Sequence, residues 1–212
     1  MSYVIVPVGL NLGPSYRYVT PPDPTPEYWE VRLGDESEHL TADEFTVWAT
    51  AFLDPERHAQ LKVSHASLLI DLARAAEPVP DPDAIIERLI ERRLLVEFDT
   101  DGSLERVFRR IQLFPCAEGM GNTPDEPDRR HIGHHGQSLL KTNYTVYGMW
   151  AFSAITSPSL WEACAEFELG AQEQLAAGAD IEDTKASEVA HELAITIPMM
   201  IALGCAFLDI VR

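Results

Sequence analysis

The chain is poor in lysine, in cysteine and in positive charge. Its 212 residues include three Lys and thirteen Arg against 34 Asp and Glu, so the formal net charge is −18. Nucleic acids and anionic membranes attract proteins through Lys and Arg, and this charge disfavours both partners unless basic residues gather on one face. The Arg-over-Lys bias, with many Ala, Pro and Asp, also hints at a GC-rich bacterial genome.

Cysteines are few and widely separated. Cys116, Cys164 and Cys205 show no C-x-x-C spacing, which indicates neither a disulfide framework nor a zinc site. We therefore expect a reduced, cytoplasmic location.

Long apolar runs are missing too. The uncharged stretch 193–208 has sixteen residues and contains Pro198 and Gly204, whereas a membrane span needs about 20. It predicts a buried C-terminal helix and no membrane partner. The segment 1–13 has no basic region and no cleavage site, so we do not expect a signal peptide.

The first half of the chain alternates strand and helix signals. Strands are predicted over 3–8 and 29–33, separated by the four prolines of 21–26, which favour a stiff arm or linker. A capping box at Thr41 and Glu44 starts one helix. Asp54-Pro55 and Asp81-Pro82 start further helices, because proline is tolerated at the first helical position. Another apolar stripe covers 68–76.

A β-hairpin is predicted after the last of these helices. Val96 and Phe98 alternate with acidic residues, Asp101-Gly102 favours a tight turn, and a return strand is expected over 104–114. Helices followed by a hairpin, over 41–114, resemble the winged helix-turn-helix superfamily and are somewhat similar to the peptide-binding PqqD-like variant. The resemblance rests on element order and implies a module that binds DNA, peptide or protein. A generic α+β domain is the alternative.

The predicted fold class is α+β, with a winged-helix-like N-terminal module and a mainly α-helical C-terminal half. We expect four segments: an N-terminal strand and Pro-rich arm (1–27), the winged-helix-like domain (28–116), an acidic, His-containing loop (117–136) and a helical C-terminal domain (137–212). The C-terminal helices are candidates for a homodimer interface. No internal repeat is evident.

Six arginines form the main candidate binding site for a partner. They are Arg88, Arg92, Arg93, Arg106, Arg109 and Arg110. On a winged helix such residues contact phosphate. Residues 81–116 nevertheless hold eight acidic side chains against these six arginines. A salt-bridged surface, a peptide or protein site, and a DNA site are the three interpretations.

Other motifs indicate little chemistry. His131, His134 and His135 are weak metal candidates, because a site needs three or four converging ligands and their spacing matches no metal motif. Nucleophile elbows, phosphate loops and dinucleotide fingerprints are missing, so no cofactor and no catalytic residue is predicted. Tyr144 and Tyr147, with Trp150, are expected in the core, or else around a ligand pocket.

These patterns favour a non-enzymatic regulatory or adaptor protein that binds a peptide or protein, with β-augmentation along the hairpin edge as the mode and an acidic partner. A winged-helix DNA-binding regulator is the second hypothesis. An enzyme of unknown class with a pocket in the C-terminal half is the third.

Overall fold

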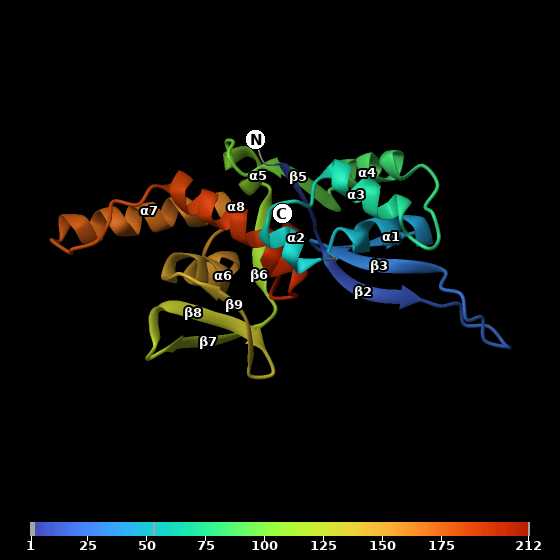
Figure 1. Ribbon diagram of the computed structural model, residues 1–212, viewed down its shortest axis with the longest axis horizontal. Coiled ribbons are helices and arrows are strands. Elements are labelled where there is room, and N and C mark those ends of the chain that lie inside the picture. Colours follow the sequence, from blue (N-terminus) through green and yellow to red (C-terminus); the bar gives the residue numbers. More distant parts are fainter. Residues whose placement is uncertain (1–2, 53, 212) are drawn as a thin grey trace.

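The chain folds as two successive copies of one arrangement of strands and helices, which lie at opposite ends of an elongated molecule (Figure 1). The computed structural model describes residues 3–52 and 54–211. We refer to 3–99 as the first repeat and 111–210 as the second repeat. The predicted α+β class is confirmed.

Each repeat contains one strand, a three-stranded meander, helices, and a closing strand. The first repeat has β1 (Tyr3–Pro7), β2 (Leu10–Ser15), β3 (Tyr28–Leu33), β4 (Glu36–Leu40), α1 (Ala42–Thr50), α2 (Pro55–Ala59), α3 (His65–Ala73), α4 (Pro82–Glu91) and β5 (Leu95–Asp99). Helix α5 (Glu105–Phe108) links the two copies. The second repeat has β6 (Ile111–Pro115), β7 (Glu118–Thr123), β8 (Glu126–His134), β9 (Gln137–Thr142), α6 (Tyr144–Thr156), α7 (Leu160–Ala176), α8 (Ala186–Ala202) and β10 (Ala206–Ile210).

In both repeats the closing strand pairs with the first strand of the same repeat. β5 is antiparallel to β1 and β10 is antiparallel to β6, which makes two two-stranded ribbons. Pro7 opposes Leu95 in one ribbon, and Pro115 opposes Ala206 in the other. The equivalent prolines end β1 and β6 and fix the correspondence between the repeats.

The helices that follow each meander also correspond. Thr41 caps α1 and Asn143 caps α6, and each side chain accepts from the amide three residues on. Trp48 and Trp150 follow seven residues after these caps. The expectation of no internal repeat is therefore wrong. It failed because the copies share few identical residues and their loops differ in length, so that only the structure aligns them.

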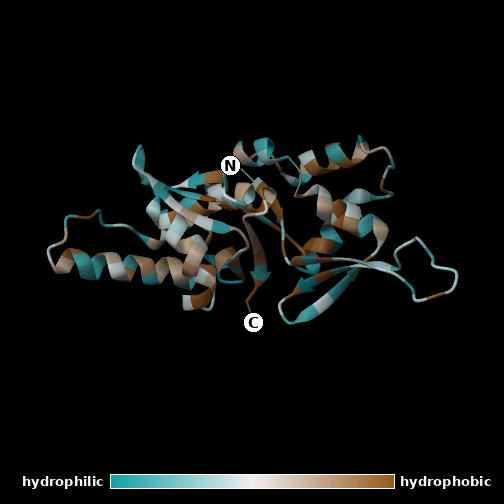
Figure 2. Ribbon diagram, turned by 90° about the horizontal axis from the view of Figure 1, so that it is seen from below, coloured by the Kyte–Doolittle hydropathy of each residue, from teal (hydrophilic) through white to brown (hydrophobic). Residues whose placement is uncertain are grey.

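One continuous apolar core joins the two repeats. Helix α8 of the second repeat packs on α2 and β1 of the first, as well as on α6 and α7. The predicted buried C-terminal helix is confirmed up to Ala202, after which the chain turns at Gly204 and enters β10. Figure 2 shows that the strands between the repeats are largely hydrophobic, whereas α7 alternates hydrophobic and hydrophilic residues.

A buried carboxylate fastens the repeats to each other. Asp209 of β10 is 4% exposed. It accepts a hydrogen bond from the Gly34 amide at 2.6 Å, in the β3–β4 turn, and lies 3.6 Å from the guanidinium of Arg32. Buried carboxylates need such partners, so Asp209 ties the second repeat to the meander of the first.

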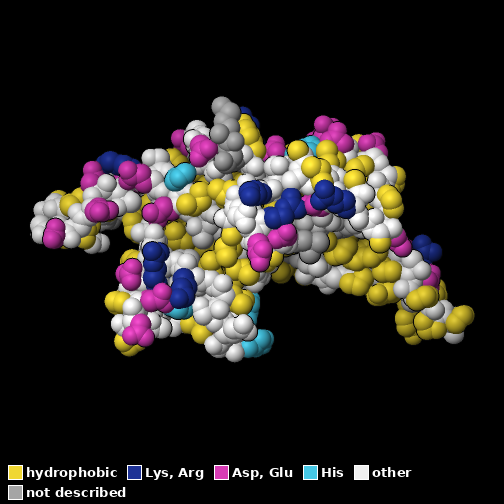
Figure 3. Space-filling view, in the orientation of Figure 1, with side chains coloured by type: hydrophobic (Ala, Val, Ile, Leu, Met, Phe, Trp, Pro, Cys, Tyr) yellow, Lys and Arg dark blue, Asp and Glu magenta, His cyan; other side chains and the backbone are white. Residues whose placement is uncertain are grey.

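Several local predictions are confirmed. The capping box of Thr41 and Glu44 is present, and Asp54 and Asp81 precede Pro at the starts of α2 and α4. The Pro-rich segment lies in an arm between β2 and β3. Hydrophobic side chains cover the tip of that arm in Figure 3, where Tyr18 is fully exposed.

The predicted hairpin after the helices is wrong. β5 pairs with β1 and β6 pairs with β10, while α5 occupies part of the expected return strand. The alternation of Val96 and Phe98 correctly indicated a strand, but its partner lies at the start of the chain. The apolar residues of the expected return strand divide between α5 and β6.

The predicted loop at 117–136 is also wrong. It contains the whole of β7 and β8, whose pairing is interrupted by register shifts at Gly119 and Gly121. Because glycine and acidic residues are uncommon in strands, their presence here predicted a loop. The C-terminal half is consequently a mixed unit with four strands before and one after its helices, not the mainly helical domain expected from 137 onward.

Candidate binding site: an arginine-lined pocket

The six arginines predicted as a partner site divide into two groups. Arg88 and Arg92 both contact Glu44, at 3.2 and 3.1 Å, and Arg92 also contacts Glu38 at 2.7 Å. Arg109 contacts Glu105 at 2.9 Å, and also Glu162. These three arginines are neutralised in place.

Glu44 forms the centre of the first of these networks. Burial raises the pKa of its carboxyl, but the hydrogen bond from the Thr41 amide and the charges of Arg92 and Arg88 outweigh burial, so that the pKa is lowered overall. Glu44 stays ionised and holds α1 against α4. The two arginines facing it therefore have a structural role.

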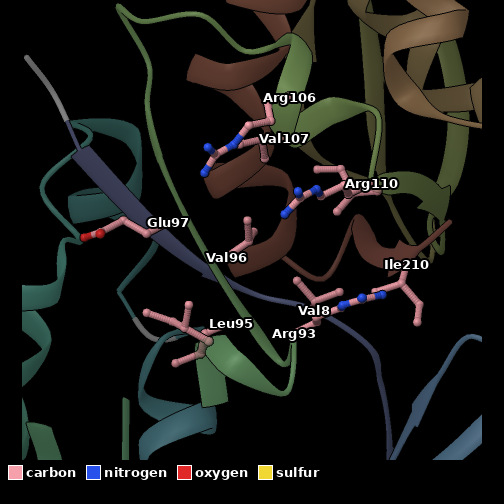
Figure 4. Close-up of a pocket in the computed structure, with 11 residues that line it drawn as sticks. Val8, Arg93, Leu95, Val96, Glu97, Arg106, Val107, Arg110 and Ile210 are labelled. Carbon is pink, nitrogen blue, oxygen red and sulfur yellow. The ribbon is translucent and has the colours of Figure 1, made fainter. Parts of the chain in front are cut away.

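The other three arginines converge on one pocket. Arg93 follows α4, Arg106 lies on α5, and Arg110 directly precedes β6. All three line a cavity of about 280 Å³ between the repeats (Figure 4). Within residues 3–52 and 54–211, none of the three forms an ion pair with a carboxylate.

The walls of this arginine pocket are apolar and come from both repeats. They are formed by Val8, Ile90, Leu95, Val96, Val107, Ile111 and Ile210. Glu97 also lines the pocket, but Figure 4 shows its carboxylate directed away from the three guanidinium groups. An anion that enters would meet several guanidinium groups beside a weakly polar wall, where charge-assisted hydrogen bonds are strong.

Arg93 has a strained backbone at the end of α4. Its φ is +62°, in the left-handed region, whereas the equivalent residue of the second repeat is Gly204 with φ +65°. In both repeats the next amide bonds back into the helix, from Leu94 to Leu89 and from Cys205 to Met200. Glycine is the usual residue at such a helix end. The first repeat instead places a long cationic side chain there, beside the pocket.

Sequence reasoning selected all three pocket arginines but for the wrong geometry. They were expected on a recognition helix and a hairpin, whereas they surround a junction between repeats. Spacing explains part of this convergence, because Arg106 and Arg110 are four residues apart around the α5 turn. The wall residues Val8 and Ile210 were missed, since nothing local indicates that the two ends of the chain meet.

The candidate metal histidines do not converge. His131 is buried, with Nδ1 2.9 Å from Ser138 Oγ, while His134 Nε2 lies 2.9 Å from the Gly204 carbonyl. His135 occupies the turn after β8 with φ +51°. No cluster of three or more metal-ligating side chains is found in the described part of the chain.

The aromatic group divides between core and surface. Trp150 is buried and donates to the Cys205 carbonyl at 2.9 Å. Tyr144 is 69% exposed, and the guanidinium of Arg130 lies over the rings of Tyr144 and Tyr147. An open depression of about 470 Å³ adjoins them between α6 and α7, with Glu166 also in its lining. Arg130 here already faces aromatic rings, unlike the arginines of the pocket.

Comparison of the chain with models of protein families, with curated proteins and with solved structures finds no match. None of the helices described is both long and apolar enough to span a membrane.

Proposed function

We propose that the protein is a non-enzymatic regulatory or adaptor protein that binds an acidic segment of a peptide or protein partner at the arginine pocket. The observation that carries this proposal is the convergence of Arg93, Arg106 and Arg110, without carboxylate partners, on an apolar cavity of a chain whose net charge is −18. Like charges that gather without opposite charges nearby reduce the stability of a fold, and proteins tolerate this mainly at functional sites.

The pocket lining argues against catalysis. It holds aliphatic residues, three arginines and Glu97, and within the described residues it includes no histidine, cysteine, serine or threonine. Acyl or group transfer needs a nucleophile and a base within hydrogen-bond reach of each other. Binding and orientation of an anion are what these side chains supply.

The charge distribution favours an acidic protein segment over DNA. Duplex DNA needs several cations along a groove or backbone, yet Arg88, Arg92 and Arg109 are already paired with glutamates. The remaining three line one partly open pocket and not an extended stripe. A carboxylate side chain with an apolar neighbour fits that combination of charge and wall.

The winged-helix resemblance and a homodimer remain proposals. Helices α1, α3 and α4 pack together in the first repeat, and a sheet precedes them, but the expected hairpin does not follow. The apolar face of α8 is covered by the same chain. A dimer would therefore use other parts of the C-terminal half, such as the exposed side of α7 around Leu169.

A direct test measures binding of labelled probes by fluorescence anisotropy at low salt. We expect a fluorescent peptide of alternating Glu and Val to bind, and its Lys-Val counterpart and a DNA duplex not to bind. An Arg106→Ala/Arg110→Ala double variant should weaken binding of the acidic peptide by at least about 100-fold, at roughly 1.5–3 kcal/mol per charged hydrogen bond lost.

Arg17→Ala/Arg129→Ala is the matched control, because it removes the same charge from exposed residues far from the pocket. Equal loss of binding in both double variants would show a general charge effect and contradict the proposal. Binding of the DNA duplex in preference to the acidic peptide would contradict it as well.

A further inference from the structure

The two ribbons have equivalent outer edges on their closing strands. In an antiparallel ladder, successive residues direct their amide and carbonyl alternately toward the partner strand and away from it. The Val8 amide donates to the Leu94 carbonyl at 2.9 Å, so Leu95 and Glu97 direct theirs away from β1. Ile5, which lies opposite Glu97, follows the same alternation, because its amide points away from β5 and donates to the Val63 carbonyl.

The same phase holds in the second ribbon. The Cys116 amide donates to Cys205, and the Val211 amide donates to Arg110. Ala206, Leu208 and Ile210 therefore direct their backbone groups away from β6. Leu208 of β10 corresponds to Glu97 of β5, since each is the second residue after the one that faces the ribbon proline.

The protein's own backbone occupies the edge of β10. The Gly9 amide donates to the Leu208 carbonyl at 2.8 Å, directly after β1. Gly9 has φ +98°, and a Cβ there would approach the side chain of Val31 to 2.6 Å. The close approach that completes this edge thus requires glycine.

Within the described chain, the equivalent edge of β5 has no such hydrogen-bonded neighbour, although side chains bury Leu95 (1% exposed) and leave Glu97 partly exposed. Among the residues described, no hydrogen bond reaches the outward backbone groups of Leu95 and Glu97. Both residues line the arginine pocket, opposite Arg106 and Arg110. An unpaired strand edge is a template for another strand, and here it lies beside three unpaired cations.

We infer that an extended, acidic segment of the partner adds to the outer edge of β5 as a further strand. Its amide would donate to the Glu97 carbonyl, as Gly9 donates to Leu208, and its carbonyl would accept from the outward Glu97 amide. Main-chain bonds would supply affinity, and alternate side chains would supply specificity. Acidic side chains at every second position would face Arg93, Arg106 and Arg110. This inference rests on the proposed function and specifies its mode.

Charge complementarity selects this occupant. A second copy of the chain would bring its own −18 net charge, but also its own arginines, to the edge. A free acidic peptide brings carboxylates alone. Self-association through β5 is therefore an alternative outcome that the test separates.

The experiment removes the edge donor without removing the ladder. Glu97→Pro deletes an outward amide, and prolines already stand at the outward positions Pro7 and Pro115. We expect Glu97→Pro to have the circular dichroism spectrum of the parent chain and to weaken binding of the Glu-Val peptide by at least about tenfold. Glu97→Gln, which keeps the amide, should bind like the parent chain or more tightly.

Peptide N-methylation supplies an independent measurement. In one Glu-Val peptide the amides of the Glu residues are methylated, and in the other those of the Val residues. The two peptides therefore differ only in which edge of the strand lacks hydrogen-bond donors. One phase should lose binding by at least about tenfold, and the other should bind almost normally. If Glu97→Pro unfolds the protein, the two methylated peptides still test strand addition with the parent chain.

The outcomes separate the two proposals. Equal binding by both methylated peptides would overturn strand addition, while loss of binding in Arg106→Ala/Arg110→Ala would still support an acidic partner. Lack of binding by the unmethylated peptide would overturn both. A dimer of the parent chain that Glu97→Pro dissociates would assign the edge to a second copy and overturn the inference.

Discussion

The indole N–H groups of Trp48 and Trp150 make the same contact in the two repeats. Trp48 Nε1 donates to the Leu94 carbonyl at 3.0 Å, and Trp150 Nε1 donates to the Cys205 carbonyl at 2.9 Å. Each carbonyl belongs to the residue before the closing strand. Each tryptophan therefore joins the first helix after a meander to the ribbon of its own repeat.

Replacing either tryptophan by phenylalanine should destabilise the fold. Trp48→Phe and Trp150→Phe each remove a buried hydrogen bond, while the carbonyls keep their bonds from the Val8 and Cys116 amides. We therefore expect the free energy of unfolding to fall by about 0.5–1.5 kcal/mol in each. Urea denaturation measures this. Trp161→Phe is the control, because Trp161 is half-buried and its indole has no hydrogen-bond partner in the described chain. A Trp161 effect as large as the other two would contradict the role of the hydrogen bonds.

Arg93→Gly should stabilise the protein while weakening its binding. A left-handed backbone costs an ordinary residue about 1 kcal/mol relative to glycine, and Arg93 has φ +62°. We expect unfolding to require about 0.5–1 kcal/mol more, and the Glu-Val peptide to bind less tightly. Gly204→Ala, at the equivalent position, should destabilise by about 1–2 kcal/mol. Destabilisation by Arg93→Gly would show that its side chain supports the fold instead.

Stability should decline in mild acid because of His58. This side chain is fully buried, its Nε2 lies 3.0 Å from the Ala51 carbonyl, and Nδ1 has no partner in the described structure. Burial lowers the pKa of His58 below its ordinary 6.5. The unfolded chain therefore binds the proton first, and the free energy of unfolding falls as pH drops below about 6.5.

Urea denaturation between pH 8 and pH 5 checks this expectation. His58→Gln should flatten the decline over that range, whereas His65→Gln, a substitution in the surface pair with Asp83, should retain it. An unchanged slope in His58→Gln would assign the decline to other groups.

The cysteines should differ sharply in reactivity. Burial raises the pKa of Cys164 to about 12 and, with the nearby Cys116, that of Cys205 to about 11. Cys116 is exposed, although burial of its sulfur raises its pKa as well. Because the thiolate is the reactive form, iodoacetamide at pH 8 should modify Cys116 first, as mass spectrometry of peptides would show. Earlier modification of Cys164 would indicate local opening around α7.

Local structure was largely predictable from the sequence. Thr41 with Glu44, and Asp54 and Asp81 before proline, act within a single turn, so their signals survive in any fold. The six arginines named from the sequence include the three that line the pocket. Their division was not predictable, because it depends on Glu38, Glu44 and Glu162, which approach only after folding.

Long-range pairing was the part that sequence patterns missed. β5 was read as half of a hairpin because Asp101-Gly102 follows it, yet its partner begins at Tyr3. Gly119 and Gly121 resemble loop residues, but they sit at irregular positions in a real ladder. The motif Val-Pro-Val at 6–8 and Phe-Pro-Cys at 114–116 marks the same strand end twice, although it is too short to reveal a duplication alone.

The two repeats use equivalent strand edges differently, and on the proposed mode of binding this difference would set the stoichiometry. Because Gly9 closes the edge of β10, of the two equivalent edges only that of β5 can accept a guest strand. On the proposed mode of binding, one chain would capture one partner, and guest strands would not link successive ribbons into a filament. Because Gly9 already occupies the edge of β10, a guest strand at β5 would be the last strand added to the molecule.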